Sequence, residues 1–179
     1  MLLTDVSLVR AAHIILASAS PRRSSILNEQ LQLSARVVRS AFDKGSLDKS
    51  ALTPPEYVME NARQKALEVY QMSERPFLSK HGRPPSLVVG ADTVVVLDGK
   101  ILEKPASVEE ARQMLRALSA AGTHSVCTGV SLVYGGGAVD SKPHMHSFFE
   151  STSVSFRRLD EVEIEAYVAS GEPMEGKVR

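Results

Sequence analysis

Two short apolar runs, each followed at once by polar side chains, place the strongest constraint on the fold of this chain. Ile14-Ile15-Leu16 leads into Ser18-Ala19-Ser20-Pro21-Arg22-Arg23, and Leu87-Val88-Val89 leads into Gly90-Ala91-Asp92-Thr93. Each run has the length of a buried strand. Because ligand sites in open α/β sheets collect at the carboxyl ends of strands, we expect both polar segments to contribute to one site. The two arginines suit phosphate oxygens, and the carboxylate suits a metal ion or a water molecule.

The rest of the chain alternates between strand and helix patterns, which predicts an α/β fold. Asp98-Gly99 between two apolar runs is a favoured two-residue hairpin turn. Thr53 and Glu56 have the spacing of a helix capping box, as do Ser107 and Glu110, and Asp160 with Glu163 is expected to cap the last helix. We expect strands over residues 13–17, 35–38, 87–101 (as a hairpin), 125–134 (broken at Thr128-Gly129) and 148–156, and helices over 20–31, 54–70, 107–118 and 160–169.

The first predicted helix begins with a strong start signal, Ser20 as N-cap and Pro21 as the first helical residue. Its apolar side chains Ile26, Leu27 and Leu31 are expected to face inward. The two arginines in its first turn oppose the helix macrodipole, a conflict that a bound anion would relieve. A helix start whose arginines are simply solvated is the alternative interpretation.

Asp92 and Lys65 each allow a structural and a functional interpretation. Asp92 lies inside an apolar strand arm, where a carboxylate is costly unless it is paired or binds a metal. The structural alternative is a hydrogen bond from Asp92 to Thr93 or to the backbone at a bulge. Lys65 lies at the edge of an apolar helix stripe, where a lysine usually lays its stem over the core and keeps its head in water.

The composition excludes several classes of function. The chain has 179 residues, zero formal net charge and 5% aromatic residues, which argues against a nucleic-acid partner. No apolar run approaches the ~20 residues of a membrane-spanning helix, so we expect no membrane partner. Cys127, the one cysteine, is expected to be a core thiol in a reducing, cytoplasmic compartment, and His144 and His146 are expected to lie on the surface.

The motifs and their order resemble the Maf proteins. The similarity runs from about Ile14 to Met174, and the first two motifs together are specific. The segments that carry it are Ser18-Ala19-Ser20-Pro21-Arg22-Arg23, Gly90-Ala91-Asp92-Thr93, Leu102-Glu103-Lys104-Pro105, Thr128-Gly129-Val130 and Ser170-Gly171-Glu172-Pro173.

The resemblance implies a fold and an activity. Maf proteins are nucleoside triphosphate pyrophosphatases that split the α–β phosphoanhydride with a divalent cation, Mg²⁺ or Mn²⁺. Their fold is a two-lobed mixed sheet flanked by helices, related to the inosine triphosphate pyrophosphatases, with the nucleotide in a central cleft. By this resemblance residues 1–179 form a single Maf-like domain, homodimers being common in the family. The segments at Pro21-Arg22-Arg23 and Gly90 to Thr93 resemble the branch that acts on dTTP and UTP or related non-standard nucleotides.

The resemblance also implies roles for individual residues. Asp92 matches the proton acceptor of the family, and Arg22 and Thr93 match positions linked to substrate choice. Asp43, which stands where a glutamate is more usual, and Asp92 are the expected metal ligands. The further polar residues expected to bind substrate are Ser18, Arg23, Lys65 and Lys104.

One departure from the family keeps an alternative open. The family continues after Glu-Pro-Met with a glutamine segment, a closing strand and a final helix that have no counterpart after Met174. Either the chain is truncated or the protein is a catalytically inactive nucleotide-binding regulatory module. A different α/β phosphohydrolase that removes the terminal phosphate is a third hypothesis.

Overall fold

A computed structural model of the protein describes residues 6–74, 86–135 and 142–173. The chain divides into two compact units: unit 1 comprises Met1–Asp92 and Gly129–Phe149, and unit 2 comprises Thr93–Thr128 and Glu150–Arg179. The expectation of a cleft between two lobes stays a prediction. The loop expected at residues 76–85 and the segment that follows Pro173 lie outside the described residues.

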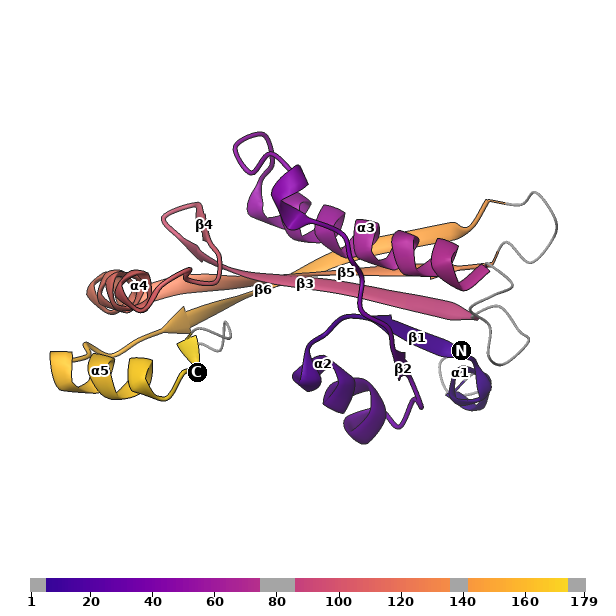
Figure 1. Ribbon diagram of the computed structural model, residues 1–179, viewed down its shortest axis with the longest axis horizontal. Helices are drawn as coiled ribbons and strands as arrows, with labels where there is room; N and C mark the ends of the chain where they lie inside the picture. The colour runs from indigo at the N-terminus through magenta and orange to yellow at the C-terminus, as the bar shows by residue number, and fades with distance from the viewer. Residues whose placement is uncertain (1–5, 75–85, 136–141, 174–179) are drawn as a thin grey trace. The chain divides into compact units, whose positions relative to one another are not determined.

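Apart from α1 and η2, which the sequence did not predict, the observed helices and strands follow the predicted order along the chain (Figure 1). The helices are α1 (Val6–Ala11), α2 (Pro21–Ser25), α3 (Pro54–Glu74), α4 (Val108–Ala121) and α5 (Glu161–Ala169), with a π-helical turn η1 (Ile26–Gln30) and a 3₁₀ turn η2 (Lys44–Ser46). The strands are β1 (Ile14–Ala17), β2 (Arg36–Val37), β3 (Leu87–Leu97), β4 (Lys100–Leu102), β5 (Thr123–Tyr134) and β6 (His144–Ser155).

The strands form one mixed sheet in the order β2-β1-β3-β5-β6, with β4 paired to β3. β1 lies parallel to both β2 and β3, whereas β3 and β4 form an antiparallel hairpin. The hairpin turn lies at Asp98-Gly99, whose φ angles of 49° and 75° are the left-handed values of a tight two-residue turn. The predicted α/β class and the hairpin are therefore confirmed.

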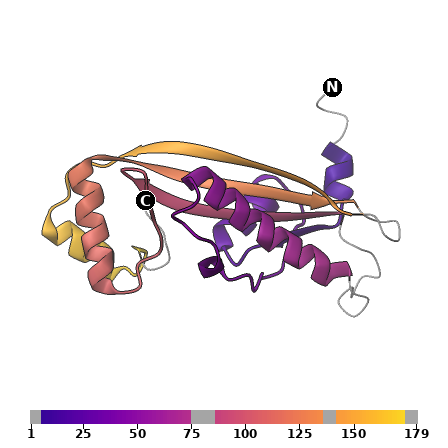
Figure 2. The same cartoon turned by 90° about the horizontal axis from the view of Figure 1, so that it is seen from above.

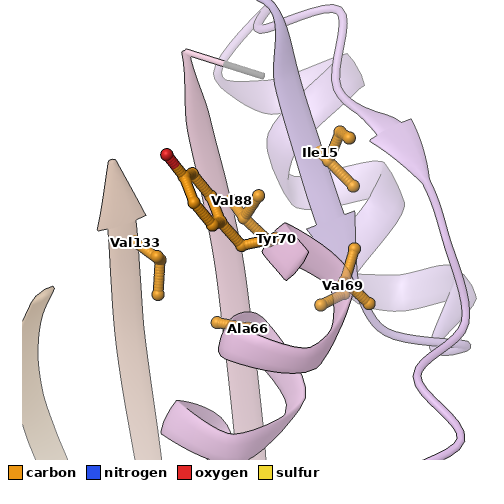
Figure 3. Close-up of a cluster of buried hydrophobic side chains, with 7 residues drawn as sticks. Ile15, Ala66, Val69, Tyr70, Val88 and Val133 are labelled. Carbon is orange, nitrogen blue, oxygen red and sulfur yellow. The ribbon is translucent and has the colours of Figure 1, made fainter. Parts of the chain in front are cut away.

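Helix α3 packs on the strands of unit 1 and supplies much of its core (Figures 1 and 2). Glu56 accepts hydrogen bonds from the backbone N–H (2.8 Å) and hydroxyl (2.6 Å) of Thr53, so the predicted helix start is confirmed. Figure 3 shows how side chains of α3 meet those of three strands. The cluster comprises Ala66, Val69 and Tyr70 of α3 with Ile15, Ala17, Val88 and Val133 of the strands.

Two glycines allow α3 to approach the sheet closely. A Cβ atom on Gly90 of β3 would lie 2.1 Å from the Ala62 carbonyl oxygen, and one on Gly129 of β5 would lie 2.4 Å from the Val58 carbonyl group. Any larger residue would push the helix away. The strand break expected at Thr128-Gly129 was wrong, because Gly129 serves helix packing and β5 runs through it without interruption.

The first helix differs from its prediction beyond its first turns. Pro21 begins α2 as expected, but the helix changes to a π-helical turn after Ser25, with Leu31 N–H donating to the Ile26 carbonyl at 3.0 Å. A π turn shifts later residues around the axis relative to α-helical spacing. Ile26 and Leu31 are exposed, at 44% and 51%, so the prediction that they face inward was wrong, whereas Leu27 is partly buried.

Unit 2 has a core of its own between α4 and α5. Ala111 and Leu115 of α4 pack with Ile164 and Val168 of α5. The predicted capping box of Asp160 and Glu163 is present, as is the N-cap of α4, where Ser107 accepts from the Glu110 N–H. The histidine of β5, His124, is 4% exposed, and burial lowers its pKa below the ordinary value.

Cys127 and two histidines have the exposure that their sequence context predicts. Cys127 is a buried free thiol, and burial raises its pKa. His144 and His146 of β6 are both exposed. Among the described residues, no helix is both long and apolar enough to cross a membrane.

Candidate active site

The two polar segments singled out in the sequence lie side by side. β1 and β3 are parallel neighbours, and their register pairs Leu16 with Val89 and Ala17 with Gly90. Ser18, which follows the end of β1 at Ala17, therefore lies beside the middle of β3. The two polar segments lie close together as predicted, but only β1 ends there. The expectation of a second strand end was wrong, because β3 continues through Asp92 to Leu97, as the predicted hairpin requires.

Arg23 links the segment that follows β1 to the middle of β3. Its Nη1 atom donates to the Ser18 hydroxyl at 3.1 Å and to the Ala91 carbonyl at 3.0 Å. Burial lowers the pKa of Arg23, and the nearby charge of Asp92 offsets part of that shift. Arg23 thus holds the polar loop against β3, and a plain solvated helix start does not describe this arginine.

Asp92 is paired with Lys65 across the interface between β3 and α3. The Lys65 Nζ atom lies 2.6 Å from Asp92 Oδ1, and the two side chains are only 13% and 2% exposed. Alternation along β3 directs Val88, Gly90 and Asp92 to the face covered by α3. The close approach at Gly90 brings Lys65, on the same stretch of helix, within reach of the carboxylate.

This ion pair corrects two expectations. Lys65 does not keep its head in water, because its ammonium group is drawn inward by a buried carboxylate. The structural alternative for Asp92, a local bond at a bulge, does not account for the lysine at 2.6 Å. A buried, paired carboxylate in the middle of an otherwise apolar strand is the arrangement expected of a functional group.

The structure does not gather every predicted site residue. Arg22 is exposed at the start of α2. Thr93 and Lys104 belong to unit 2, where Lys104 is exposed and the Thr93 hydroxyl lies 3.0 Å from the Thr128 hydroxyl. The substrate-binding roles of these residues stay predictions.

Asp43 lies in the loop before η2, at the surface of unit 1. Its Oδ1 atom accepts from the Gly45 N–H at 2.9 Å, and its carbonyl accepts from the Ser46 hydroxyl at 2.8 Å. A Cβ atom on Gly45 would lie 3.2 Å from Asp43 Oδ1, so a glycine leaves room for this carboxylate. Asp43 therefore has a defined backbone conformation, set by its own turn.

The donor set fits a divalent cation that arrives with a phosphate ligand. Asp43 and Asp92 offer the hard carboxylate oxygens that Mg²⁺ and Mn²⁺ favour. Within residues 6–74, 86–135 and 142–173, no group of three or more His, Cys, Asp or Glu side chains could hold a metal. Mg²⁺ commonly binds through one or two carboxylates together with substrate phosphates. Asp43 and Asp92 match that pattern, and not a site in which protein side chains supply every ligand.

Sequence reasoning missed two polar residues of α3. Asn61 is fully buried, and its Nδ2 atom donates to the Tyr57 carbonyl at 3.0 Å. Glu68 contacts the segment that leads to Asp43. The only sequence signal for Glu68 is its position three residues after Lys65, which places both on neighbouring parts of one helix face.

Comparison with known proteins assigns the fold and the family. A solved dITP/XTP pyrophosphatase from Mycobacterium abscessus has the same fold, with a TM-score of 0.51 at 13% identity over 82% of this chain and 75% of that one. The profile of the family described as "Maf-like protein" matches residues 13–177. The chain belongs to the Maf-like family.

Relatives with described activities share much of the sequence. A dTTP/UTP pyrophosphatase from Pelotomaculum thermopropionicum is 45% identical over 162 residues, which cover 90% of this chain and 74% of that protein. A human protein, described as "Probable bifunctional dTTP/UTP pyrophosphatase/methyltransferase protein", is 45% identical over 168 residues. The match covers 90% of this chain but only 25% of the human protein.

Proposed function

We propose that this protein hydrolyses the α–β phosphoanhydride of dTTP, UTP or a related nucleotide, releasing a nucleoside monophosphate and pyrophosphate. The observation that carries the proposal is the buried Lys65–Asp92 pair in the middle of β3, next to the loop that Arg23 holds against the same strand. The activities named for the family relatives support the choice of substrate.

Asp92 is the proposed proton acceptor. A carboxylate can align a water molecule and take its proton as the water attacks phosphorus, a contribution of roughly 10²–10⁴-fold in rate. The ammonium group of Lys65, whose Nζ atom donates to Asp92 Oδ1 at 2.6 Å, fixes the direction of the carboxylate. The pair thus places a base in a position protected from bulk water.

The cationic side chains are proposed to bind the triphosphate. Arg22 offers a guanidinium group, which matches phosphate oxygens bidentately. Ser18 and Arg23 shape the loop through their mutual hydrogen bond. Thr93 and Lys104 are proposed as further substrate contacts on the strength of the family resemblance.

A divalent cation is the proposed cofactor. Asp43 and Asp92 would hold Mg²⁺ or Mn²⁺ together with phosphate oxygens, and the bound ion would neutralise charge on the phosphates. The proton transfer itself is assigned to Asp92. Removal of divalent cations with EDTA is expected to abolish turnover, and added Mg²⁺ or Mn²⁺ is expected to restore it.

The test is product analysis with a panel of nucleoside triphosphates. Monophosphate plus pyrophosphate from dTTP or UTP is expected, whereas diphosphate plus phosphate would identify a different hydrolase. Tight nucleotide binding without any product would favour a regulatory module.

Asp92→Asn keeps the size of the side chain and is expected to lose roughly 10²–10⁴-fold in turnover while it still binds nucleotide. Asp98→Asn in the exposed turn of the same hairpin is the matched control, since its left-handed φ of 49° suits asparagine. Wild-type pyrophosphate release by Asp92→Asn would refute the assigned role.

A further inference from the structure

Glu68 of α3 binds the segment that immediately precedes Asp43. Its Oε2 atom accepts hydrogen bonds from the backbone N–H groups of Ala41 (2.9 Å) and Phe42 (3.1 Å), and from the hydroxyl of Ser40. The Ser40 hydroxyl in turn accepts from the Phe42 N–H at 3.1 Å. One carboxylate oxygen thus receives three donors from three consecutive residues.

This arrangement is stronger than an ordinary loop contact. Hydrogen bonds to an ionised acceptor are roughly twice as strong as neutral ones, and successive backbone N–H groups form a natural anion site. Glu68 is partly buried, so its charge is less screened than that of a surface residue. The segment is therefore fixed to α3 just before the candidate metal ligand.

Asp43 is consequently held from both sides. Glu68 fixes the backbone through Phe42, and the turn after Asp43 is closed by the Ser46 N–H and hydroxyl, both bonded to the Asp43 carbonyl. The two anchors fix the backbone of Asp43, and the Gly45 N–H, which donates to Asp43 Oδ1 at 2.9 Å, orients its carboxylate. Lys65, which binds Asp92, lies three residues before Glu68 on the same helix.

We propose that Glu68 is a positioning residue for Asp43, which fixes the backbone that presents the Asp43 carboxylate to the divalent cation. The inference rests on the proposed function, in which Asp43 is a metal ligand. Loss of a residue that orients a ligand typically weakens metal affinity by about 10–100-fold. Glu68 acts through the backbone of Asp43, so we expect the lower end, about tenfold.

The first measurement is made on the cation-free protein. Residue-resolved hydrogen exchange is expected to show faster exchange of the Ala41 and Phe42 amides in Glu68→Ala than in the wild type. Glu68→Gln keeps an acceptor oxygen without the charge and is expected to be intermediate. Glu60→Ala is the matched control, because Glu60 is a carboxylate of the same helix that bonds Arg63 and Gln64 instead. Unchanged exchange in Glu68→Ala would overturn the proposal.

The second measurement is Mn²⁺ binding in the presence of a non-hydrolysable α,β-methylene analogue of dTTP, followed by the electron paramagnetic resonance signal of free Mn²⁺. Glu68→Ala is expected to raise the apparent dissociation constant for Mn²⁺ about tenfold, Glu68→Gln less, and Glu60→Ala not at all. Faster amide exchange with an unchanged Mn²⁺ constant would show that Glu68 only anchors the loop, and would overturn the proposal.

These readouts separate the inference from the proposed function. A wild-type protein that binds Mn²⁺ with the analogue but releases no pyrophosphate from dTTP would refute the proposed activity, while the Mn²⁺ constants still decide the role of Glu68. A wild-type protein that binds no Mn²⁺ under these conditions would overturn the inference directly.

Discussion

Removal of the Lys65 ammonium group is the most direct test of the site, because it leaves the buried Asp92 carboxylate without its ionic partner. The Nζ–Oδ1 distance of 2.6 Å corresponds to an attraction of about 6 kcal/mol at an effective dielectric constant of 20, most of which offsets the lost hydration of both groups. A buried carboxylate left without its cation typically costs about 3–5 kcal/mol. Lys65→Met, which keeps the length of the side chain, is therefore expected to lower the free energy of unfolding by about 3–5 kcal/mol at pH 7.

Urea unfolding measures this loss, and a second substitution tests its cause. With a denaturant slope of about 2 kcal/mol/M, the midpoint of Lys65→Met is expected to fall by about 1.5–2.5 M. The double variant Lys65→Met/Asp92→Asn also removes the carboxylate charge that Lys65→Met leaves without a cation. This double variant is expected to be more stable than Lys65→Met, although both variants would be inactive.

Arg63→Met is the control for losing a cation from α3. Arg63 pairs with Glu60 at 2.6 Å with both side chains about one-third exposed, and such helix-surface pairs contribute about 0.3–0.5 kcal/mol. Should Lys65→Met cost no more than Arg63→Met, or should the Asp92 substitution fail to restore stability, the ammonium group would be solvated. Either result would show that the Lys65–Asp92 pair is not buried.

Two further predictions concern packing and pH. Gly90→Ala would place a Cβ atom 2.1 Å from the Ala62 carbonyl oxygen, so we expect the free energy of unfolding in urea to fall by about 1–3 kcal/mol and turnover to be reduced. Gly99→Ala is the control, because its Cβ atom would have no neighbour within 4 Å. It should lower stability only through the positive φ of residue 99, and turnover should be unchanged. The pKa of His124 is lowered on folding, so protons bind the unfolded state first and stability is expected to fall as the pH drops through about 6.5. His124→Phe should remove that loss between pH 7.5 and 5.5, and an unchanged pH slope in thermal unfolding would contradict the assignment.

Most of the secondary structure could be predicted because it follows from local patterns. Caps such as Ser107 and Asp160 satisfy backbone groups within a few residues, and the Asp98-Gly99 turn requires left-handed φ values that glycine tolerates. The π turn after Ser25 could not be predicted, because apolar spacing does not distinguish it from a regular helix. Leu31, whose N–H closes that turn, is exposed where regular helical spacing predicts an inward side chain.

The site could be predicted only in part, for a different reason. Ser18 and Asp92 could be found from the sequence, since polar residues after an apolar run are a local signal. That signal did not show that β3 continues through Asp92 to Leu97. Lys65 looked like an ordinary helix-edge lysine, because its contact with Asp92 depends on how closely α3 approaches β3. Gly90 sets that approach from 25 residues further along the chain, and only the packed structure shows the connection.

The Lys65–Asp92 pair is better explained by chemistry than by stability. An apolar pair of similar volume at the same position would often be as stable or more stable, because neither group would lose hydration. The core of unit 1 around it is well supplied with apolar contacts, including Ala66 of the same helix. This charged pair gives no clear gain in stability, and it lies in the middle of β3 beside a loop held by Arg23. Natural folds depart from ordinary packing rules in this way where they keep a reactive group. The candidate active site is therefore built around this charged pair, and the apolar residues of α3 stabilise it by packing on the sheet.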